Sequence, residues 1–187
     1  MILPWRLVDS RYLIRDRWMT LRADRCELPE GGVVDPYYVQ ESPDWVQVVA
    51  FDALERILIT RQYRHGAGVV CAEVPCGNVE SGELPEQAMR RELLEETGCA
   101  VETLEPLSSL YSNPARDCNR IHAFVATGAR CAQSQRLDST ESIEFEFLPI
   151  PEVLRLMDSG GFPQALHVAH LLLALRRRCL LPLASPL

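Results

Sequence analysis

The chain lacks long hydrophobic runs and has little positive charge, and each absence excludes a class of function. Its longest apolar stretch, Leu171–Leu175, is far shorter than the roughly 18 residues of a transmembrane helix. Met1–Arg11 is interrupted by Arg6 and Asp9, so it does not have the pattern of a signal peptide. The 19 basic residues are outnumbered by 26 acidic ones, whereas a protein that follows a phosphate backbone has a basic surface. We therefore expect no membrane and no duplex nucleic acid as a partner.

The sequence also lacks the cysteine patterns of metal centres and disulfide frameworks. Its seven cysteines are odd in number and widely spaced, with no CxxC pair and no Cys/His cluster at zinc spacing. This distribution predicts reduced thiols and a cytoplasmic location. His167 and His170 are three residues apart on an expected helix, but no third ligand is near them in the sequence. We expect structural roles for both histidines.

The residues that are present suffice for one folded domain. The chain has 187 residues, of which 47% are hydrophobic and 24% charged, a composition typical of a globular protein rather than a disordered one. At this length folding buries roughly 70% of the surface of the unfolded chain, so no disulfides are needed for stability. The net charge of −7 still permits phosphate binding if the chain holds divalent cations.

The order of the expected elements predicts a mixed α/β fold. The N-terminal part alternates short apolar strands with turns, which favours an antiparallel arrangement, and Trp5–Val8 and Tyr12–Ile14 are expected as two separate strands. Strong helix formers follow over Leu84–Thr97, and strands then resume. Two helices are expected at the end of the chain, over Pro151–Asp158 and Gln164–Cys179. Helices should therefore cover two sides of a largely β centre.

The helix expected over Leu84–Thr97 has carboxylates where a helix disfavours them. Gly98 is placed as a C-terminal stop, so Glu92, Glu95 and Glu96 fall in the last turn. Glu92 and Glu96 repel each other by about 0.2–0.5 kcal/mol, and each carboxylate also meets the negative end of the helix dipole. A hard cation such as Mg²⁺ or Mn²⁺ would neutralise this cluster with oxygen ligands. The alternative is a solvated acidic face without a function.

The residues around these carboxylates resemble the signature of the Nudix hydrolases. Eight of the nine positions that the signature defines are matched, and the ninth, usually Ile, Leu or Val, is Cys99. The matched residues are Gly77, Glu83, Arg91, Glu92, Leu93, Glu95, Glu96 and Gly98.

The resemblance implies a Nudix-type α/β/α sandwich with a mixed sheet, preceded by an N-terminal antiparallel β region. It also implies that Glu92, Glu96 and often Glu95 hold Mg²⁺ or Mn²⁺ together with the backbone carbonyl of Cys76. Glu95 is a candidate for catalysis as well, and Arg91 is expected to brace the site, since an arginine binds carboxylates without competing as a ligand. The chemistry implied is hydrolysis of a nucleoside diphosphate linked to another group, in which metals neutralise charge and acidify a bound water.

The flanking sequence resembles one branch of that family. Gln62-Tyr63-Arg64 and the segment Glu73–Gly77 are similar to the surroundings found in ADP-ribose pyrophosphatases and nucleoside diphosphate sugar hydrolases. Arg64 would then contact the diphosphate of the substrate. Pro114 also resembles a proline found in the ADP-ribose enzymes, but no glycine follows it closely, which keeps other nucleoside diphosphate sugars open as substrates.

The same resemblance divides the chain at residue 44. Residues 1–44 would form the N-terminal β region, which builds a homodimer in that branch, and residues 45–187 the catalytic sandwich of a single Nudix domain. Arg22 and Trp45 are the candidates for further substrate contacts. A tryptophan in a strand is, however, more often part of a core or interface than a platform for a base.

A glutamate in a late loop can act as the general base in related enzymes, and Glu141 is the candidate here by position. It precedes an expected strand in which Ile143, Phe145 and Phe147 share one face. Glu144 therefore lies on the other face, where a solvated role is expected.

Two hypotheses follow. The first is metal-dependent hydrolysis of ADP-ribose or a related nucleoside diphosphate sugar to a nucleoside monophosphate and a sugar phosphate. The alternative is a non-catalytic Nudix-like sensor that binds a nucleotide sugar. Such sensors tend to lose metal carboxylates, whereas the signature here retains them, which favours the enzyme.

Overall fold

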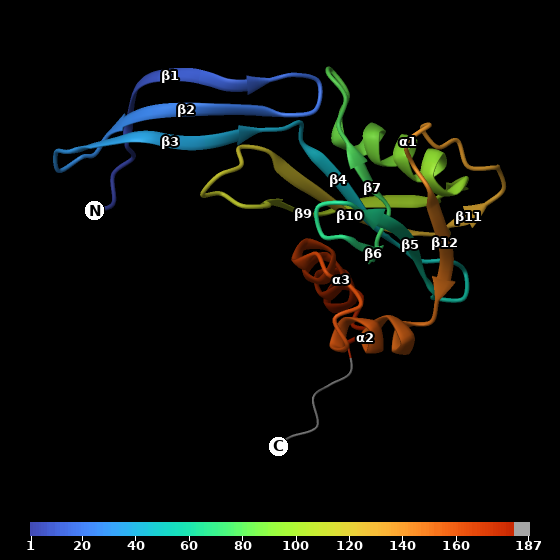
Figure 1. Cartoon of the computed structure of the whole chain (residues 1–187). Coiled ribbons are helices and arrows are strands. Elements are labelled where there is room, and N and C mark those ends of the chain that lie inside the picture. Colours follow the sequence, from blue (N-terminus) through green and yellow to red (C-terminus); the bar gives the residue numbers. More distant parts are fainter. Residues whose placement is uncertain (182–187) are drawn as a thin grey trace. The chain divides into compact units, whose positions relative to one another are not determined.

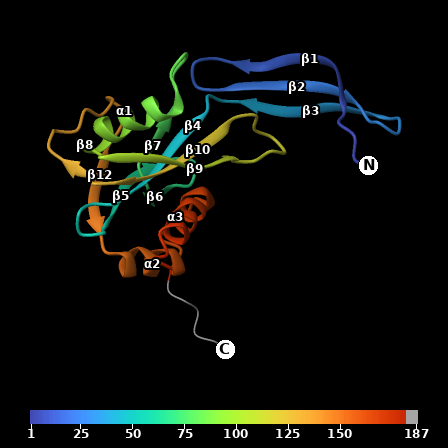
Figure 2. The same cartoon turned by 180° about the vertical axis from the view of Figure 1, so that it is seen from behind.

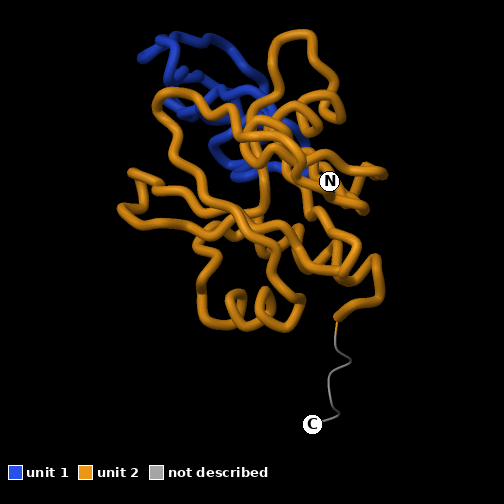
Figure 3. Tube along the Cα trace, turned by 90° about the vertical axis from the view of Figure 1, so that its right-hand side faces the viewer, with its two compact units in different colours: residues 1–44, 110–120 blue, residues 45–109, 121–187 orange. Residues whose placement is uncertain are grey.

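The computed structural model describes residues 1–181, and these form two compact units (Figure 3). Unit 1 consists of residues 1–44 and 110–120, and unit 2 contains the rest of the described chain. The last six residues of the predicted catalytic span, 45–187, lie outside the described residues. Within 1–181 no helix is both long and apolar enough to cross a membrane.

Along the chain, strands dominate the first half, and helices appear at α1 and at the C-terminal end (Figure 1). The elements are β1 (Arg6–Arg15), β2 (Thr20–Glu27), β3 (Val33–Glu41), β4 (Trp45–Ala50), β5 (Ile57–Arg64), β6 (Val69–Glu73), β7 (Cys76–Asn78), α1 (Pro85–Thr97), β8 (Cys99–Ala100), β9 (Thr103–Tyr111), β10 (Arg120–Thr127), β11 (Arg130–Cys131), β12 (Ile143–Leu148), α2 (Ile150–Asp158) and α3 (Ala165–Arg177).

Unit 1 contains an antiparallel sheet in the order β1-β2-β3, which confirms the predicted N-terminal β region. The two strands expected at Trp5–Val8 and Tyr12–Ile14 are instead one strand, β1, with two shifts in its register against β2. The polar segment between them does not turn, because it pairs with β2. Ser10 lies opposite Asp24, and its hydroxyl donates a 2.6 Å hydrogen bond to that carboxylate.

Unit 2 is built around β4, which is buried along almost its whole length, and β5, whose first four residues are buried. β4 pairs in parallel with β10 and antiparallel with β7, and β5 pairs antiparallel with β6 and β12. Alternation along β4 divides its side chains between two cores. Val46 and Val48 pack with α1, whereas Val49 packs with α3. Figures 1 and 2 show α1 on one side of these strands and α2 and α3 on the other, which confirms the predicted α/β/α sandwich.

The short strands β8 and β11 contradict the expectation of fully reduced cysteines. Cys99 lies directly opposite Cys131 in this pair, and a disulfide bond joins them. The two residues are 32 positions apart, so neither their spacing nor the odd cysteine count indicates the pair. The other cysteines of the described chain are free.

A buried polar pair lies between β4 and α3. Gln47 and His170 are both 0% exposed, and Nδ1 of His170 is 2.5 Å from Oε1 of Gln47. Burial disfavours the charged imidazole, so it lowers the pKa of His170 to about 4. The folded state therefore contains a neutral imidazole at pH 7.

This histidine should make the fold sensitive to acid. Between about pH 6.5 and pH 4 the unfolded chain binds the proton that the folded chain excludes, so the free energy of unfolding falls as pH falls. At about 1.4 kcal/mol per pH unit, the contribution of His170 is a loss of about 3 kcal/mol across this window. Urea unfolding at a series of pH values should show that the free energy of unfolding of His170→Asn falls less steeply with falling pH than that of the wild type.

The matched control is His65→Asn, at an exposed position. In this variant the free energy of unfolding should fall as steeply with pH as in the wild type. An unchanged slope in His170→Asn would show that the buried imidazole is not responsible.

Candidate active site

The signature residues centre on one helix, α1, and a glycine determines where it ends. Pro85 lies in the first turn, where its missing N–H removes no helical hydrogen bond. Gly98 ends the helix with a φ of 65°, in the left-handed region, and its N–H donates to the carbonyl of Leu94. A Cβ at position 98 would lie 1.9 Å from the carbonyl oxygen of Gln133. Only glycine therefore allows the last turn of α1 to approach this later segment.

Two carboxylates of that last turn pack against β7. Glu96 is 6% exposed, and the backbone N–H of Cys76 donates a 3.1 Å hydrogen bond to its Oε2. A Cβ at Gly77 would lie 2.0 Å from the carboxyl carbon of Glu92. Glycine at position 77 thus leaves space for the Glu92 carboxylate beside the strand.

Arg91 connects three carboxylates of the signature. Its Nε and Nη2 atoms donate to the two oxygens of Glu83 at 3.0 and 2.9 Å. Nη1 donates to Glu92 at 2.9 Å and to Glu95 at 3.1 Å. Because a guanidinium can bind several carboxylates at once, Arg91 reduces the repulsion among them.

The electrostatics of the cluster favour a bound cation. Burial raises the pKa of Glu92, and it raises the pKa of Glu96 well above its usual range. Glu141 raises both pKa values further, although Arg91 opposes the shift at Glu92. Carboxylates that are costly to ionise together are an oxygen donor set that fits a hard dication. The residues therefore fit Mg²⁺ or Mn²⁺.

The segment after β11 is attached to the C-terminal end of α1. The backbone N–H of Gln133 donates to the carbonyl of Gly98, and that of Arg136 donates to the carbonyl of Glu95. The side-chain amide of Gln135 donates to the carbonyl of Glu96. The last carbonyls of a helix have no intrahelical partner, so this segment satisfies them. It also leads directly to the loop that contains Glu141.

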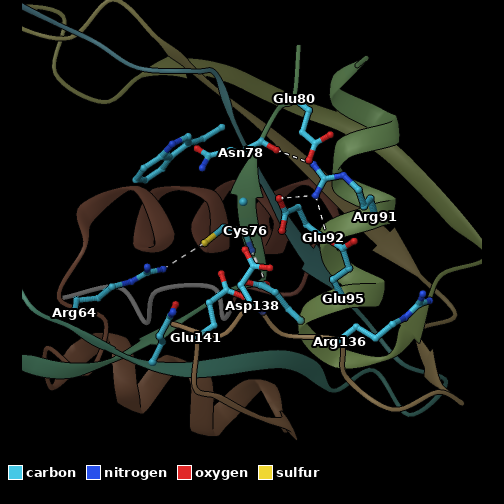
Figure 4. Close-up of a pocket in the computed structure, with 14 residues that line it drawn as sticks. Arg64, Cys76, Asn78, Glu80, Arg91, Glu92, Glu95, Arg136, Asp138 and Glu141 are labelled. Atoms are coloured by element: carbon cyan, nitrogen blue, oxygen red, sulfur yellow. Dashed lines mark hydrogen bonds and ion pairs between the residues drawn. The ribbon is translucent and has the colours of Figure 1, made fainter. Parts of the chain in front are cut away.

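These elements surround a pocket of about 380 Å³ (Figure 4). In the close-up, α1 supplies Glu92 and Glu95, β7 supplies Cys76, and the loop before β12 supplies Glu141. The full lining is Trp45, Gln62, Arg64, Cys76, Gly77, Asn78, Glu80, Arg91, Glu92, Glu95, Glu96, Arg136, Asp138 and Glu141.

Most residues expected at the site therefore line one pocket, and one does not. Trp45 and Arg64 are on the lining with the carboxylates. Arg22 belongs to unit 1, where its guanidinium binds Asp24 at 2.8 Å and also binds Glu41. Arg22 is not among the residues that line the pocket, and its contact with the substrate stays a prediction.

Arg64 is oriented by a buried carboxylate. Its Nε and Nη2 atoms donate to the two oxygens of Glu73 at 2.8 and 2.6 Å. The side chain of Glu73 is 3% exposed, whereas that of Arg64 is 43% exposed. A fork-to-fork pair of this kind fixes the plane of the guanidinium and leaves part of it facing the pocket.

The pocket also includes residues that the sequence pattern does not indicate. Asp138 and Arg136 lie on the loop with Glu141, and Asn78 and Glu80 lie at the end of β7 and just after it. Asn78 and Glu80 fall inside the signature span at positions that the signature leaves undefined. The loop residues have no local pattern, because contacts with α1 place them.

Comparison with known proteins identifies the class to which this site belongs. The NUDIX domain matches residues 42–168, which is more than half of the chain. The chain therefore belongs to the Nudix hydrolase family, as the signature predicted. A second family, the nucleoside diphosphate sugar hydrolase N-terminal domain, matches residues 5–40.

Individual relatives match most of the chain. It is 30% identical over 155 residues to the ADP-ribose pyrophosphatase of Bacillus subtilis (strain 168), covering 82% of this chain and 83% of the relative. It is also 30% identical over 151 residues to the methanol dehydrogenase activator of Bacillus methanolicus, covering 80% and 81%. The crystal structure of an ADP compounds hydrolase has the same fold, with a TM-score of 0.84 at 20% identity over 97% of this chain and 99% of that one.

The buried carboxylates generate a prediction about stability and activity together. Glu92→Gln and Glu96→Gln should each remove most activity, yet leave the metal-free melting temperature unchanged or slightly raised. The reason is that burial opposes ionisation at both positions, and the amide oxygen introduced by Glu96→Gln can still accept from the Cys76 N–H. Calorimetry in the presence of a chelator measures the stability.

Glu86→Gln is the matched control, because Glu86 lies in the first turn of the same helix and its side chain accepts from the exposed Arg90. It should retain activity. A clear fall in melting temperature in the Glu92 or Glu96 variant would instead show that these carboxylates are structural.

Proposed function

We propose that this chain hydrolyses the pyrophosphate bond of ADP-ribose or a related nucleoside diphosphate sugar with the help of Mg²⁺ or Mn²⁺. The products would be a nucleoside monophosphate and a sugar phosphate. The observation that carries the proposal is the pocket in which Glu92, Glu96 and Arg64 line the same space. The matches to a sugar hydrolase N-terminal domain and to an ADP-ribose pyrophosphatase support the substrate class.

Cation binding is assigned to the oxygen donors beside Gly77. Glu92, Glu96 and the backbone carbonyl of Cys76 would hold the metal, with Glu95 as a further carboxylate. When bound, the cation neutralises charge on the pyrophosphate and lowers the pKa of a bound water. Arg91 keeps these carboxylates in place through its hydrogen bonds to Glu92 and Glu95.

The substrate is assigned to the side of the pocket that contains Arg64. Glu73 fixes the plane of this guanidinium, which suits two-point binding of a phosphate. Trp45 lines the same pocket and offers an apolar ring to the rest of the substrate. Arg22 remains a predicted contact to the nucleotide.

We assign to Glu141 the role of the general base, which accepts the proton of the attacking water. Its Oε2 accepts a 3.1 Å hydrogen bond from the backbone N–H of Asp138, and its own N–H donates to the carbonyl of Asp138. This turn holds the carboxylate on the lining of the pocket. A carboxylate in this place can take a proton when water attacks.

The direct test is incubation with a panel of nucleoside diphosphate compounds and Mg²⁺, followed by chromatography of the products. ADP-ribose and other nucleoside diphosphate sugars should be cleaved, with Glu96→Gln as the inactive control. No cleavage of any compound, in a protein shown to bind Mg²⁺, would contradict the proposal.

The second candidate is the sensor, and one relative gives a reason to retain it. The relative from Bacillus methanolicus is named as an activator of another enzyme. A sensor would bind ADP-ribose without consuming it, so the panel separates the two functions.

Glu141→Gln should lower kcat by about 10²–10⁴-fold and change KM little, because it removes a base and retains size and hydrogen bonding. Steady-state kinetics against pH measures the effect, and raising the pH should partly restore the rate. Glu144→Gln, at an exposed position on β12, is the matched control and should be close to wild type. If the cation alone generates the nucleophile, the loss in Glu141→Gln should stay below about tenfold.

A homodimer through unit 1 completes the proposal. All of β1 is exposed although it contains Leu7 and Leu13, and it is the edge strand of its sheet. An exposed edge strand that carries apolar side chains is suited to pairing with a second copy. Sedimentation should therefore show a dimer at micromolar concentration and a monomer for Leu13→Asp. Val70→Asp, an exposed position on β6, is the control that should remain dimeric; a monomeric wild type would contradict the proposal.

A further inference from the structure

One side chain closes the loop that contains Glu141. This loop, residues 136–142, leads from the segment bound to α1 to the first residue of β12, Ile143. The side-chain amide of Gln135, just before the loop, donates a 2.9 Å hydrogen bond to the backbone carbonyl of Ile143, just after it. The same amide nitrogen donates to the carbonyl of Glu96 at 2.5 Å. Gln135 therefore joins both ends of the loop to the last turn of α1.

These two hydrogen bonds use the full donor capacity of the amide. A primary amide nitrogen has two N–H groups, and at Gln135 two carbonyl oxygens accept from it. The carbonyl of Glu96 lies in the last turn of α1, where helical N–H groups no longer reach it. The side chain of Gln135 is also half-buried, which limits competition from water. The contact is therefore a specific link between two backbone segments.

The hydrogen bonds of the loop itself are local. The N–H of Arg136 donates to the carbonyl of Glu95, which holds the beginning of the loop on α1. Further along, the N–H of Asp138 donates to Oε2 of Glu141, and the N–H of Glu141 donates to the carbonyl of Asp138. The last two bonds shape a turn but do not attach it to α1. The position of the turn relative to α1 therefore follows from how the ends of the loop are held.

We propose that Gln135 is a positioning residue for the general base. The inference rests on the proposed function, in which Glu141 accepts the proton of the attacking water. Gln135 is not among the residues that line the pocket, so it acts through Glu141 and not by contact with substrate. Glu96 connects the two regions, because its side chain lines the pocket and its carbonyl accepts from Gln135.

The expected effect is on the rate rather than on substrate binding. A general base must lie within hydrogen-bond reach of the water that it deprotonates, and a misplacement of about 1 Å can cost about 10²-fold in rate. Without the bond from Gln135, the end of the loop is no longer tied to α1, and the carboxylate of Glu141 is less often in place. Arg64 is oriented separately, by both oxygens of Glu73, so KM should change little.

Donor and acceptor variants at position 135 separate this role from packing. Gln135→Met keeps the length and removes both donors, so kcat should fall about tenfold or more. Gln135→Glu is closest to glutamine in shape, but an ionised carboxylate only accepts and would face two carbonyl oxygens, so its kcat should fall at least as far. Gln135→Lys supplies an ammonium that can donate to both carbonyls at the negative end of the helix, and it should retain most of the rate. Near-wild-type kcat for Gln135→Glu, or equal losses in all three variants, would indicate packing alone and overturn the proposal.

Gln133→Met is the matched control. Gln133 lies two residues earlier in the same segment, at an exposed position, and its side chain accepts a long hydrogen bond, 3.5 Å, from Arg136. Its backbone N–H donates to the carbonyl of Gly98, a bond that the substitution keeps. Both kcat and KM should stay close to the wild type. A loss equal to that of Gln135→Met would show that any change in this segment lowers the rate, and would overturn the assignment to Gln135.

A double variant tests whether Gln135 acts through Glu141. If Gln135 places the base, little remains for Gln135→Met to remove once Glu141→Gln has removed the base itself. The double variant should therefore have a kcat within about threefold of Glu141→Gln alone. Losses that multiply would mean that the two residues act independently, which would overturn the proposal.

Hydrogen–deuterium exchange measures the loop without any substrate. In a peptide that covers residues 134–143, hydrogen bonds to Glu95 and Asp138 protect the N–H groups of Arg136 and Glu141. Gln135→Met should speed exchange in this peptide several-fold, whereas Gln133→Met should exchange like the wild type. Exchange in α3 is the reference for global stability and should not change. Unaltered exchange of the loop peptide in Gln135→Met would overturn the proposal.

Exchange and kinetics together distinguish a failure of this inference from a failure of the proposed function. A chain that hydrolyses none of the nucleoside diphosphate compounds, yet whose loop exchange responds to Gln135→Met, would contradict the proposed function. The catalytic role of Gln135 would fall with it, while the link between α1 and β12 would stand. Hydrolysis that depends on Glu141 but not on Gln135 would overturn the present proposal alone.

Discussion

The burial of two carboxylates at the C-terminal end of α1 is the constraint on which the rest of unit 2 depends. Glu92 and Glu96 carry like charge, meet the negative end of the helix dipole and are removed from water. Each of these effects destabilises the ionised fold. The structure offsets them with several donors, among them the backbone N–H of Cys76 and the guanidinium of Arg91.

Those donors determine the path of the surrounding chain. β7 must pass close enough for the Cys76 N–H to reach Glu96, which requires the absence of a side chain at Gly77. The segment after β11 must approach the end of α1 so that its N–H groups can donate to the last carbonyls of the helix. This approach requires that position 98 also lacks a side chain. Because that segment continues into the loop of Glu141, satisfying the helix terminus also brings a further carboxylate to the pocket. The backbone hydrogen bonds that satisfy the end of α1 therefore also assemble the pocket.

The sequence predicts the parts of this arrangement that local chemistry determines. The C-terminal limit of α1 followed from Gly98, and the mixed α/β class followed from the order of strands and helices. The sandwich was implied by the resemblance to the Nudix signature. The single strand β1 was missed, because the polar residues around Ser10 resemble a turn until β2 supplies a partner for them. β8 and β11 are each two residues long and have no periodicity of their own.

The residues around Glu73 illustrate the same limit at the level of chemistry. Sequence spacing separates His167 from Glu73 and Cys76 by about ninety positions, so the proximity of these side chains cannot be read from the chain. Packing of α3 against the end of β6 brings the three together, and the Val74 N–H then selects which nitrogen of the ring faces the others. Tertiary contacts of this kind have no sequence period, whereas the carboxylates of α1 lie within a single helical turn.

The charges on the pocket imply an order of events. Six carboxyl groups but only three arginines are among its described lining residues, and Arg91 is engaged by the carboxylates of its own helix and by Glu83. A pyrophosphate entering this pocket without a cation would meet a surplus of negative charge at short range, where water screens little. Arg64 offers a guanidinium that is fixed by Glu73 and still partly exposed. If the chain acts as proposed, cation binding would precede or accompany substrate binding, because the cation would offset the repulsion between the acidic pocket and the pyrophosphate.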